Sequence, residues 1–283
     1  MNHNERDRSA DSIFVDGTEV PYHSAGPSEG DSPVLVMVHG STGSTDSHYG
    51  YLFPMLAFRQ RVVSIDLQLP TQGGALALEQ LVRQVGAVID RVSGGKPVSL
   101  MGYSLGAVVA AAVAAGRPDS VRNLVLVAGW MKTDAHQQLR NGVWRELRAA
   151  GSPATRNYMV FCAFSPGFVA ARTPQELAGM AGKITLDGFV DQQMDLNGRI
   201  DIVDQVSKIR ATTLVVGCTQ DQMVPRTHSL QLFGAIDDAR YTEIDSGHAV
   251  VFERPAELLR LVDTFLRQPS ASAAGSIIPT ARP

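Results

Sequence analysis

Short apolar runs alternate with amphipathic stretches along most of the 283-residue chain. The runs are short and lack the polar alternation of a half-exposed strand, so they predict strands buried on both faces of a parallel sheet. They cover residues 34–38, 62–65, 98–101, 124–127, 213–216 and 241–244. Helices are predicted between or after them at 78–92, 105–116 and 256–266. This alternation predicts an α/β fold with a doubly wound sheet.

The alternation of strands and helices is interrupted between residue 131 and about residue 206. This region predicts helices and loops without a clear strand, and its candidate helices are 135–149, 157–164, 174–181 and 186–196. We interpret it as a helical cap, or lid, that is inserted over one edge of the sheet. The two core segments would then be residues 12–130 and 207–268.

Both ends of the chain look unlike the core. Residues 1–11 are polar, and residues 269–283 are rich in Ser, Ala and Pro without periodic apolar positions, so we predict that both are disordered. Residues 12–24 predict a β-hairpin around the Asp16-Gly17 turn.

The charge balance is nearly even, with 25 basic and 28 acidic residues and a formal net charge of −3. A nucleic-acid-binding domain would be basic, so we expect no nucleic-acid partner. The two cysteines, Cys162 and Cys218, are too few for a disulfide framework or a zinc cluster. They indicate free thiols in a reducing compartment.

No segment of the sequence predicts a membrane span. The longest apolar stretch is 105–116, which is shorter than the roughly 20 residues that a spanning helix needs. The first residues are charged and lack the apolar core of a signal peptide. We therefore expect a cytoplasmic protein with no membrane partner, and the sequence leaves its oligomeric state unknown.

The strongest chemical signal is Gly102-Tyr103-Ser104-Leu105-Gly106. It lies between a predicted strand and a predicted helix, which is the context that the G-x-S-x-G nucleophile elbow requires. Glycines on both sides allow the sharp turn that holds the serine hydroxyl at the C-terminal edge of the sheet. This pattern predicts that Ser104 is a nucleophile.

A serine nucleophile needs a base, and His248 is best placed among the seven histidines. It follows the last predicted strand, so its loop returns to the same edge of the sheet as Ser104. The third member should orient the imidazole. Asp221 follows the strand predicted at 213–216. The three residues then occur along the chain in the order Ser104, Asp221, His248, which is the order of serine, acid and histidine in proteins with this elbow. Asp134 and Asp245 are the alternatives for the acid.

An oxyanion hole needs two preorganised hydrogen-bond donors. One would be the backbone N–H of Leu105, directly after the nucleophile. The loop after the strand at 34–38 reads His39-Gly40-Ser41-Thr42-Gly43, and its small residues allow close approach to a ligand. We assign the second donor to the N–H of Ser41. The loop lacks the lysine of a P-loop and the glycine pattern of a dinucleotide site.

These motifs resemble those of the α/β-hydrolase family, over roughly residues 34–266. The matching segments are His39-Gly40-Ser41, the elbow around Ser104, Asp221 ahead of Val224-Pro225, and Gly247-His248. The resemblance implies a mostly parallel eight-stranded sheet with a helical cap between two core halves. One departure is the loop 67–74, where many relatives have a Gly-rich, Ser-containing loop. That loop is not catalytic in the family, so the predicted triad stands.

Large apolar side chains are frequent in the cap region. We expect most of them to pack the cap onto the core and a few to line a largely apolar pocket. The candidate substrate-binding residues are His39, Tyr103, Trp130, Trp144 and Phe164.

Three functions are compatible with these residues. The first is a serine hydrolase that cleaves an ester, thioester or related acyl bond of a small-molecule substrate, with neither a metal nor an organic cofactor. The second keeps the fold but changes the reaction to that of a cyclase, a lyase or a carbon–carbon bond hydrolase. The third, which an intact triad disfavours most, is a ligand-binding protein on a hydrolase scaffold.

Overall fold

A computed structural model describes residues 8–27, 32–71 and 73–279 of the chain. One sheet of eight strands runs through it in the order β1-β2-β4-β3-β5-β6-β7-β8. Strands β1 and β2 form an antiparallel hairpin, β2 pairs antiparallel with β4, and the remaining neighbours are parallel. The predicted α/β fold is confirmed. The strands are β1 Ser9–Val15, β2 Thr18–Ala25, β3 Leu35–Val38, β4 Val62–Ile65, β5 Val98–Tyr103, β6 Val121–Val127, β7 Thr212–Cys218 and β8 Ala239–Ile244.

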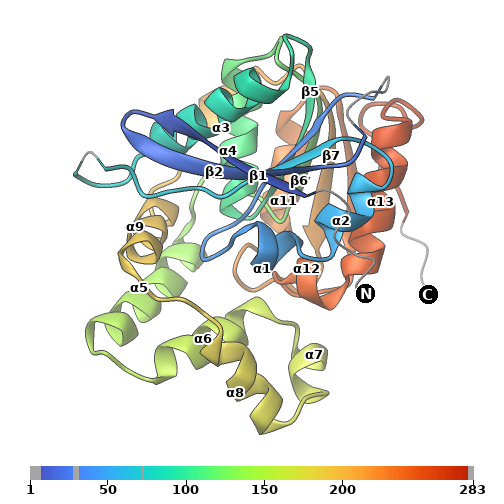
Figure 1. The fold of residues 1–283 in the computed structure, drawn as a ribbon. Helices are drawn as coiled ribbons and strands as arrows, with labels where there is room; N and C mark the ends of the chain where they lie inside the picture. The colour runs from blue at the N-terminus through green and yellow to red at the C-terminus, as the bar shows by residue number, and fades with distance from the viewer. Residues whose placement is uncertain (1–7, 28–31, 72, 280–283) are drawn as a thin grey trace, which may run out of the picture.

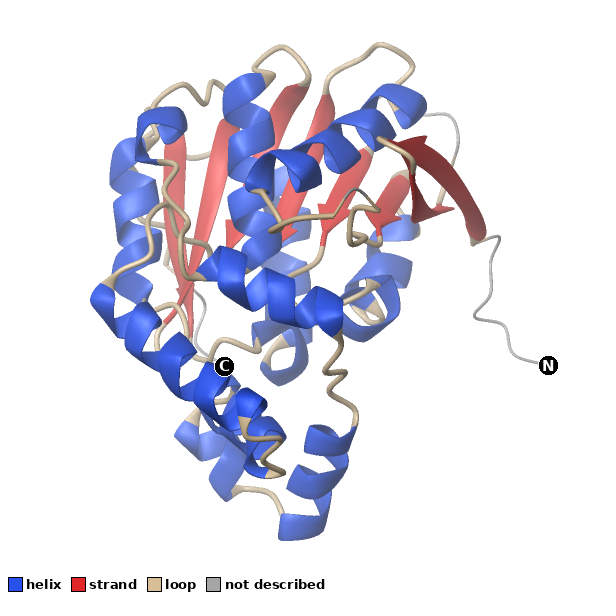
Figure 2. Ribbon diagram, turned by 90° about the vertical axis from the view of Figure 1, so that its left-hand side faces the viewer, coloured by secondary structure: helices blue, strands red, loops and turns tan. Residues whose placement is uncertain are grey.

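Helices cover both faces of the sheet, as Figure 2 shows. On one face, α3 (Leu78–Val92), α4 (Leu105–Gly116) and α11 (Arg226–Ala235) contribute to a single apolar core. On the other face, α2 (Leu52–Ala57) and α13 (Pro255–Arg267) pack against the opposite side chains of the same strands. Burial on both faces explains why the central strands read as continuous apolar runs.

Helix α4 is the central helix of the first layer. Its residues are buried from Leu105 to Ala115, and it contacts strands β5 and β6 on one side and α3 on another. A helix that is apolar around its whole circumference belongs in a core. The helix therefore holds the turn at its N-terminus in a fixed position.

A group of helices lies beyond the C-terminal ends of the parallel strands, whose arrowheads point toward it in Figure 2. Figure 1 shows α5 to α8 below the sheet and α9 at its side. The last helix of the series, α10, instead contacts α4 of the core. These helices are α5 Ala135–Ala149, α6 Ala154–Ala163, α7 Pro166–Ala170, α8 Pro174–Gly182, α9 Gly188–Asn197 and α10 Val203–Val206.

We predicted disorder at both ends of the chain, and this prediction is wrong for residues 9–11 and 275–278. Residues 9–11 belong to β1, an edge strand that tolerates polar residues. Residues 275–278 run beside β8: Gly275 N–H donates to the Ala239 carbonyl (2.8 Å) and Ile278 N–H to the Tyr241 carbonyl (2.7 Å). An edge strand offers unpaired backbone groups, and pairing with them needs no apolar periodicity. Residues 1–7 and 280–283 lie outside the described residues.

Six of the described helices were not predicted from the sequence: α1 (Thr45–Tyr49), α2, α7, α10, α11 and α12 (Val250–Glu253). All of them except α11 have six residues or fewer, which is too short to show an apolar period. The described residues include no helix that is long and apolar enough to cross a membrane. Both cysteines are buried and free of disulfide bonds.

Candidate active site

The turn between β5 and α4 holds Ser104 in a strained conformation. Its φ is 56° and its ψ is −124°, a combination that costs a residue other than glycine about 1–3 kcal/mol. A Cβ at position 102 would lie 2.1 Å from the Gly106 carbonyl oxygen, and one at position 106 would lie 2.1 Å from that of Val38. Only glycine fits at these two positions. The turn therefore presents the Ser104 side chain at the C-terminal edge of the sheet.

The structure brings Ser104, His248 and Asp221 together in one hydrogen-bonded chain. His248 Nε2 lies 2.8 Å from Ser104 Oγ, and His248 Nδ1 lies 2.7 Å from Asp221 Oδ2. All three residues are buried. An ionised carboxylate can only accept a hydrogen bond, so Nδ1 carries the ring proton and Nε2 faces the serine hydroxyl as an acceptor.

Asp221 is fixed by the loop that follows β7. Its Oδ1 atom accepts hydrogen bonds from the N–H groups of Met223 and Val224, both at 2.8 Å. Its side chain is completely buried. The carboxylate is therefore held in place before any ligand binds.

The two alternative acids have other partners. Asp134 caps α5, where its Oδ1 accepts from the N–H of Gln137 at 2.9 Å, and its Oδ2 lies 3.2 Å from His228 Nε2. Asp245 is exposed, and its Oδ1 accepts from the side chains of Thr219 and Gln220, both at 2.7 Å.

The loop after β3 lies directly against the nucleophile. A Cβ at Gly40 would come within 2.8 Å of Ser104 Cβ. Among the described residues, neither the N–H of Ser41 nor that of Leu105 has a hydrogen-bond acceptor. Leu105 is the first residue of α4, where backbone N–H groups have no partner within the helix. Both N–H groups are available to a ligand beside Ser104.

Two buried histidines support this loop. His39 Nδ1 donates to the Gly40 carbonyl (2.8 Å), and its Nε2 accepts from Leu67 N–H (3.1 Å). His48 Nδ1 accepts from Gly40 N–H (3.3 Å). Burial lowers the pKa of His39, and burial with the nearby charges of His39 and His248 lowers the pKa of His48 to about 3. Both rings are therefore neutral near pH 7. His48 is not among the residues predicted for the site, because its spacing from His39 carries no recognisable motif.

Tyr103 is also occupied within the protein. Its hydroxyl donates to the His248 carbonyl at 3.0 Å, and its ring meets His48 edge to face with centroids 5.2 Å apart. Burial raises the pKa of this hydroxyl well above its usual value. The contacts of Tyr103 position the His248 loop.

The predicted aromatic residues of the cap region occupy different places. Trp130 donates to Thr133 Oγ1 (3.0 Å) and belongs to the core under α4. Phe164 stacks on Phe168, with ring centroids 4.6 Å apart, beside the His248 loop. Trp144 is buried among apolar residues of α6 and α9, and its Nε1 has no hydrogen-bond partner among the described residues.

Glu253 joins the helices beyond the sheet to the His248 loop. Its Oε1 accepts from the N–H groups of Gly247 (3.0 Å) and Ser165 (2.8 Å), and its Oε2 accepts from Ser165 Oγ at 2.6 Å. The sequence analysis missed this residue, since the contact joins positions 88 apart in the chain.

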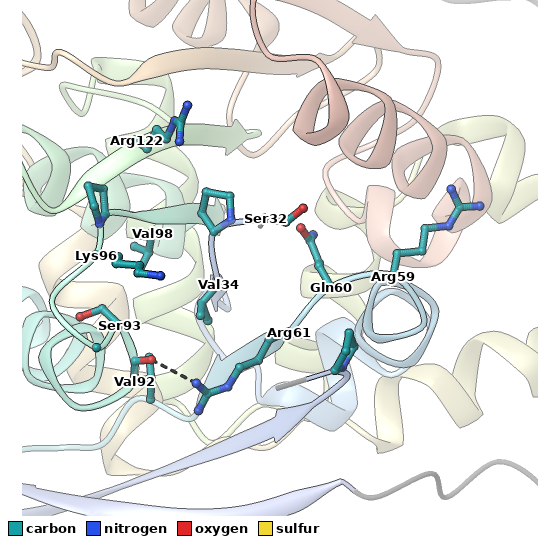
Figure 3. A pocket seen from close by; sticks show the side chains of 14 residues that line it. Ser32, Val34, Arg59, Gln60, Arg61, Val92, Ser93, Lys96, Val98 and Arg122 are labelled. Carbon is teal, nitrogen blue, oxygen red and sulfur yellow. Dashed lines mark hydrogen bonds between the residues drawn. The ribbon is translucent and has the colours of Figure 1, made fainter. Parts of the chain in front are cut away.

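A separate surface hollow of about 590 Å³ lies at the opposite edge of the sheet (Figure 3). Val98 begins β5 and lines this hollow, whereas Ser104 follows the other end of that strand. Several basic side chains surround it, and Arg61 donates to the Val92 carbonyl at 3.2 Å. The hollow is thus remote from the hydrogen-bonded chain around Ser104.

Comparison with known proteins agrees with the fold described above. The profile of the "Alpha/beta hydrolase family" matches residues 35–261. The chain is 30% identical over 247 residues to the pyrrolizixenacetamide deacetylase of Xenorhabdus hominickii, across 84% of this chain and 92% of that protein. It is 28% identical over 258 residues to a Rhizobium rhizogenes protein whose name proposes a carbamate hydrolase, RutD, across 84% and 94%.

A solved structure is similar in fold. It is MGS-M2, described as an alpha/beta hydrolase enzyme from a Medee basin deep-sea metagenome library. The TM-score is 0.81 at 19% identity, over 91% of this chain and 98% of that chain.

Proposed function

The chain is a hydrolase of the alpha/beta hydrolase family, and we propose that it cleaves an acyl bond through an acyl-serine intermediate on Ser104. The observation that carries the proposal is the continuous hydrogen-bonded chain from Asp221 through His248 to Ser104 Oγ, at 2.7 Å and 2.8 Å. These contacts support the roles of nucleophile, base and orienting acid for the three residues.

In the first half of the reaction, Ser104 Oγ attacks the carbonyl carbon of the substrate and its proton moves to His248 Nε2. Asp221 accepts the hydrogen bond from Nδ1–H and stabilises the imidazolium that forms. The N–H groups of Ser41 and Leu105 donate to the substrate oxygen as it becomes negative. His248 then gives its proton to the leaving atom, and the acyl group stays on Ser104.

In the second half, His248 removes a proton from a water molecule, which attacks the acyl carbon. The tetrahedral intermediate collapses, and the proton on His248 returns to Ser104 Oγ. Over the whole cycle one water is consumed. The alcohol, thiol or amine leaves in the first half of the reaction, and the carboxylic acid is released in the second half. No step requires a group beyond those of the chain, the substrate and water.

Two relatives bear on the bond that is cleaved. One is named as a deacetylase of an acetamide, and the name of the other proposes a carbamate hydrolase. Both names favour an acyl group bonded to a heteroatom over carbon–carbon chemistry. Amides and carbamates therefore join esters and thioesters as substrates to be tested.

We further propose that residues 131–206 act as a cap that selects the substrate. Its α9 contacts the loop after β3: Asn197 Nδ2 donates to Ser41 Oγ, and Thr42 N–H donates to Gln193 Oε1, both at 3.0 Å. At the other side, the Ala163 carbonyl accepts from the N–H of Ala249, the residue after His248, at 2.8 Å. Contacts on both sides of Ser104 support a position over the substrate.

The proposal is tested with a panel of activated esters, thioesters and N-acyl amides and with a fluorophosphonate probe that labels activated serines. The wild-type protein should hydrolyse members of the panel and be labelled, whereas Ser104→Ala should do neither. Ser120→Ala is the matched control, because Ser120 lies at the opposite end of the sheet before β6. Equal turnover by folded Ser104→Ala and Ser120→Ala would refute the acyl-serine mechanism.

A further inference from the structure

Helix α5 carries three N–H donors for which the described part of the chain offers no partner. Arg140 Nε, Asn141 Nδ2 and Trp144 Nε1 are buried atoms without a hydrogen-bond acceptor among the described residues. Asn141 is only 3% exposed and Trp144 only 2%. Buried N–H groups are nearly always paired, so three orphans on one helix indicate that their acceptor comes from outside the chain.

Arg140 also lacks a counter-charge. No described carboxylate forms an ion pair with it, and its Nη2 donates to the neutral Asn141 Oδ1 at 2.6 Å. Burial lowers the pKa of Arg140, yet a guanidinium keeps its charge in proteins. Arg140 is partly buried and its Nε is cut off from solvent, and a charge removed from water is normally paired. The missing partner should therefore be an anion.

The three donors lie between the parts of the cap that contact the two loops beside Ser104. Tyr158 of α6 donates to the Arg140 carbonyl at 3.3 Å, and α6 ends at Ala163, which accepts from the residue after His248. On the other side, Asn141 lies close to Gly198, the residue after α9. A Cβ atom placed at Gly198 would be 3.7 Å from Asn141 Nδ2.

Arg140 is also within electrostatic range of Cys162 and Tyr158 on α6 and, more weakly, of Asp221. Its charge interacts with that of Asp221, the buried carboxylate that holds His248. Asp221 forms its hydrogen bond with His248 and no ion pair with Arg140. A nearer anion would therefore be needed to balance the charge of Arg140. A substrate on Ser104 that extended between α6 and α9 would bring such an anion to Arg140.

We infer that the substrate carries a carboxylate, remote from the bond that is cleaved, and that Arg140, Asn141 and Trp144 bind it beneath the cap. This inference rests on the proposed acyl-serine function. A carboxylate offers two oxygens with about four acceptor positions, which suits one guanidinium and two neutral N–H donors. On α9, Asn197 Oδ1 also has no hydrogen-bond partner within the described ranges and would accept one hydrogen bond from the rest of the substrate.

The test compares two series of 4-nitrophenyl esters. One series consists of half-esters of dicarboxylic acids from succinate to suberate, which keep a free carboxylate. The other consists of the same compounds with that carboxylate methylated. The measured quantity is the ratio of kcat/KM between the acid and its methyl ester at each chain length. The wild-type protein should prefer the acid by about 10- to 100-fold at its best chain length, as expected for charge-assisted hydrogen bonds.

The variants identify the residues responsible. Arg140→Gln should bring the ratio close to one, Arg140→Lys should keep part of it, and Trp144→Phe should lower it while retaining the aromatic ring. Arg145→Gln is the matched control, because it removes the same charge from an exposed position of α5. If Arg140→Gln fails to fold, the Lys and Phe variants carry the test.

The outcomes separate this inference from the proposed function. Hydrolysis of both series without an acid preference, or a preference that survives in Arg140→Gln, would overturn the carboxylate site and leave the acyl-serine mechanism standing. If neither series is hydrolysed, the free dicarboxylates and their monomethyl esters are titrated against Ser104→Ala by calorimetry. Tighter binding of the diacid that is lost in Ser104→Ala/Arg140→Gln supports the site, and equal binding of both forms overturns it.

Discussion

Two buried polar regions, the hydrogen-bonded chain around Ser104 and the N–H donors of α5, differ in how their hydrogen bonds are satisfied. Around Ser104, Asp221 accepts three hydrogen bonds and His248 uses both ring nitrogens. On α5, which belongs to the proposed cap, three N–H donors lack any described acceptor. A buried unsatisfied polar group costs about 1–3 kcal/mol. The chain thus completes its proposed chemical machinery by itself, whereas its proposed recognition surface becomes complete only with a ligand.

The largest expected effect comes from removing the nucleophile. Ser104→Ala should lower kcat by about 10⁴- to 10⁶-fold on the best substrate of the panel, because no other group can carry the acyl intermediate. Steady-state kinetics on protein with an unchanged circular dichroism spectrum measures the loss. A folded variant with more than a tenth of wild-type activity would show that the complete polar region is not the catalytic one.

Asp221→Asn should have the next largest effect. The amide cannot stabilise the imidazolium and favours the wrong ring tautomer, so kcat should fall by about 10⁴-fold. Asp134→Asn is the matched control, since asparagine caps a helix as well as aspartate does. The control should keep nearly all activity, and a larger loss at Asp134 than at Asp221 would reassign the acid.

Glu253 links Ser165, which precedes α7, to the His248 loop, and its amide variant should have an intermediate effect. Glu253→Gln replaces one acceptor oxygen by a donor that faces N–H or O–H groups of Ser165 and Gly247. We expect kcat/KM to fall by about 10-fold, since misplacement of a catalytic group by about 1 Å costs up to 100-fold. Glu257→Gln on α13 is the control. Unchanged kinetics and melting temperature for Glu253→Gln would show that the link is dispensable.

The smallest expected effect concerns pH. Burial lowers the pKa of His39 and His48 in the folded protein, so the unfolded chain binds more protons below about pH 6.5. Their contribution to stability is present above that pH and is lost as the pH falls toward the folded-state value, which is about 3 for His48. Within this window His48 should cost up to about 1.4 kcal/mol per pH unit, and the lowered pKa of His39 adds a loss in the same direction.

Urea denaturation at pH 7.0, 6.0 and 5.0 measures this dependence. In His48→Gln, an amide oxygen can accept from Gly40 N–H without titrating, so the loss between pH 7 and 5 should be smaller than in the wild-type protein. An identical pH dependence of the two proteins would contradict a buried neutral His48.

The sequence was most informative where a local pattern had a single structural meaning. The apolar runs, the glycines around Ser104 and the strand ends before Asp221 and His248 predicted the sheet and the proximity of these groups, because parallel strands end at one edge. Contacts between distant segments had no such signal. The sequence did not reveal Glu253 or His48, because their hydrogen-bond partners come close only in the folded chain. It did not reveal Arg140 either, because only the folded structure shows that its Nε has no acceptor among the described residues. Residues 275–278 run beside β8 because of backbone hydrogen bonds. A pattern of side chains cannot predict such bonds.

The acyl-serine intermediate itself is the most direct test of the account. A 4-nitrophenyl ester is mixed with excess wild-type protein, quenched in acid within milliseconds and analysed by intact mass and peptide mapping. We predict an added mass equal to the acyl group, located on the peptide that contains Ser104, formed before the second product is released and absent from Ser104→Ala. Turnover of the same ester without a covalent species, or with the acyl group on another residue, would contradict the proposed mechanism.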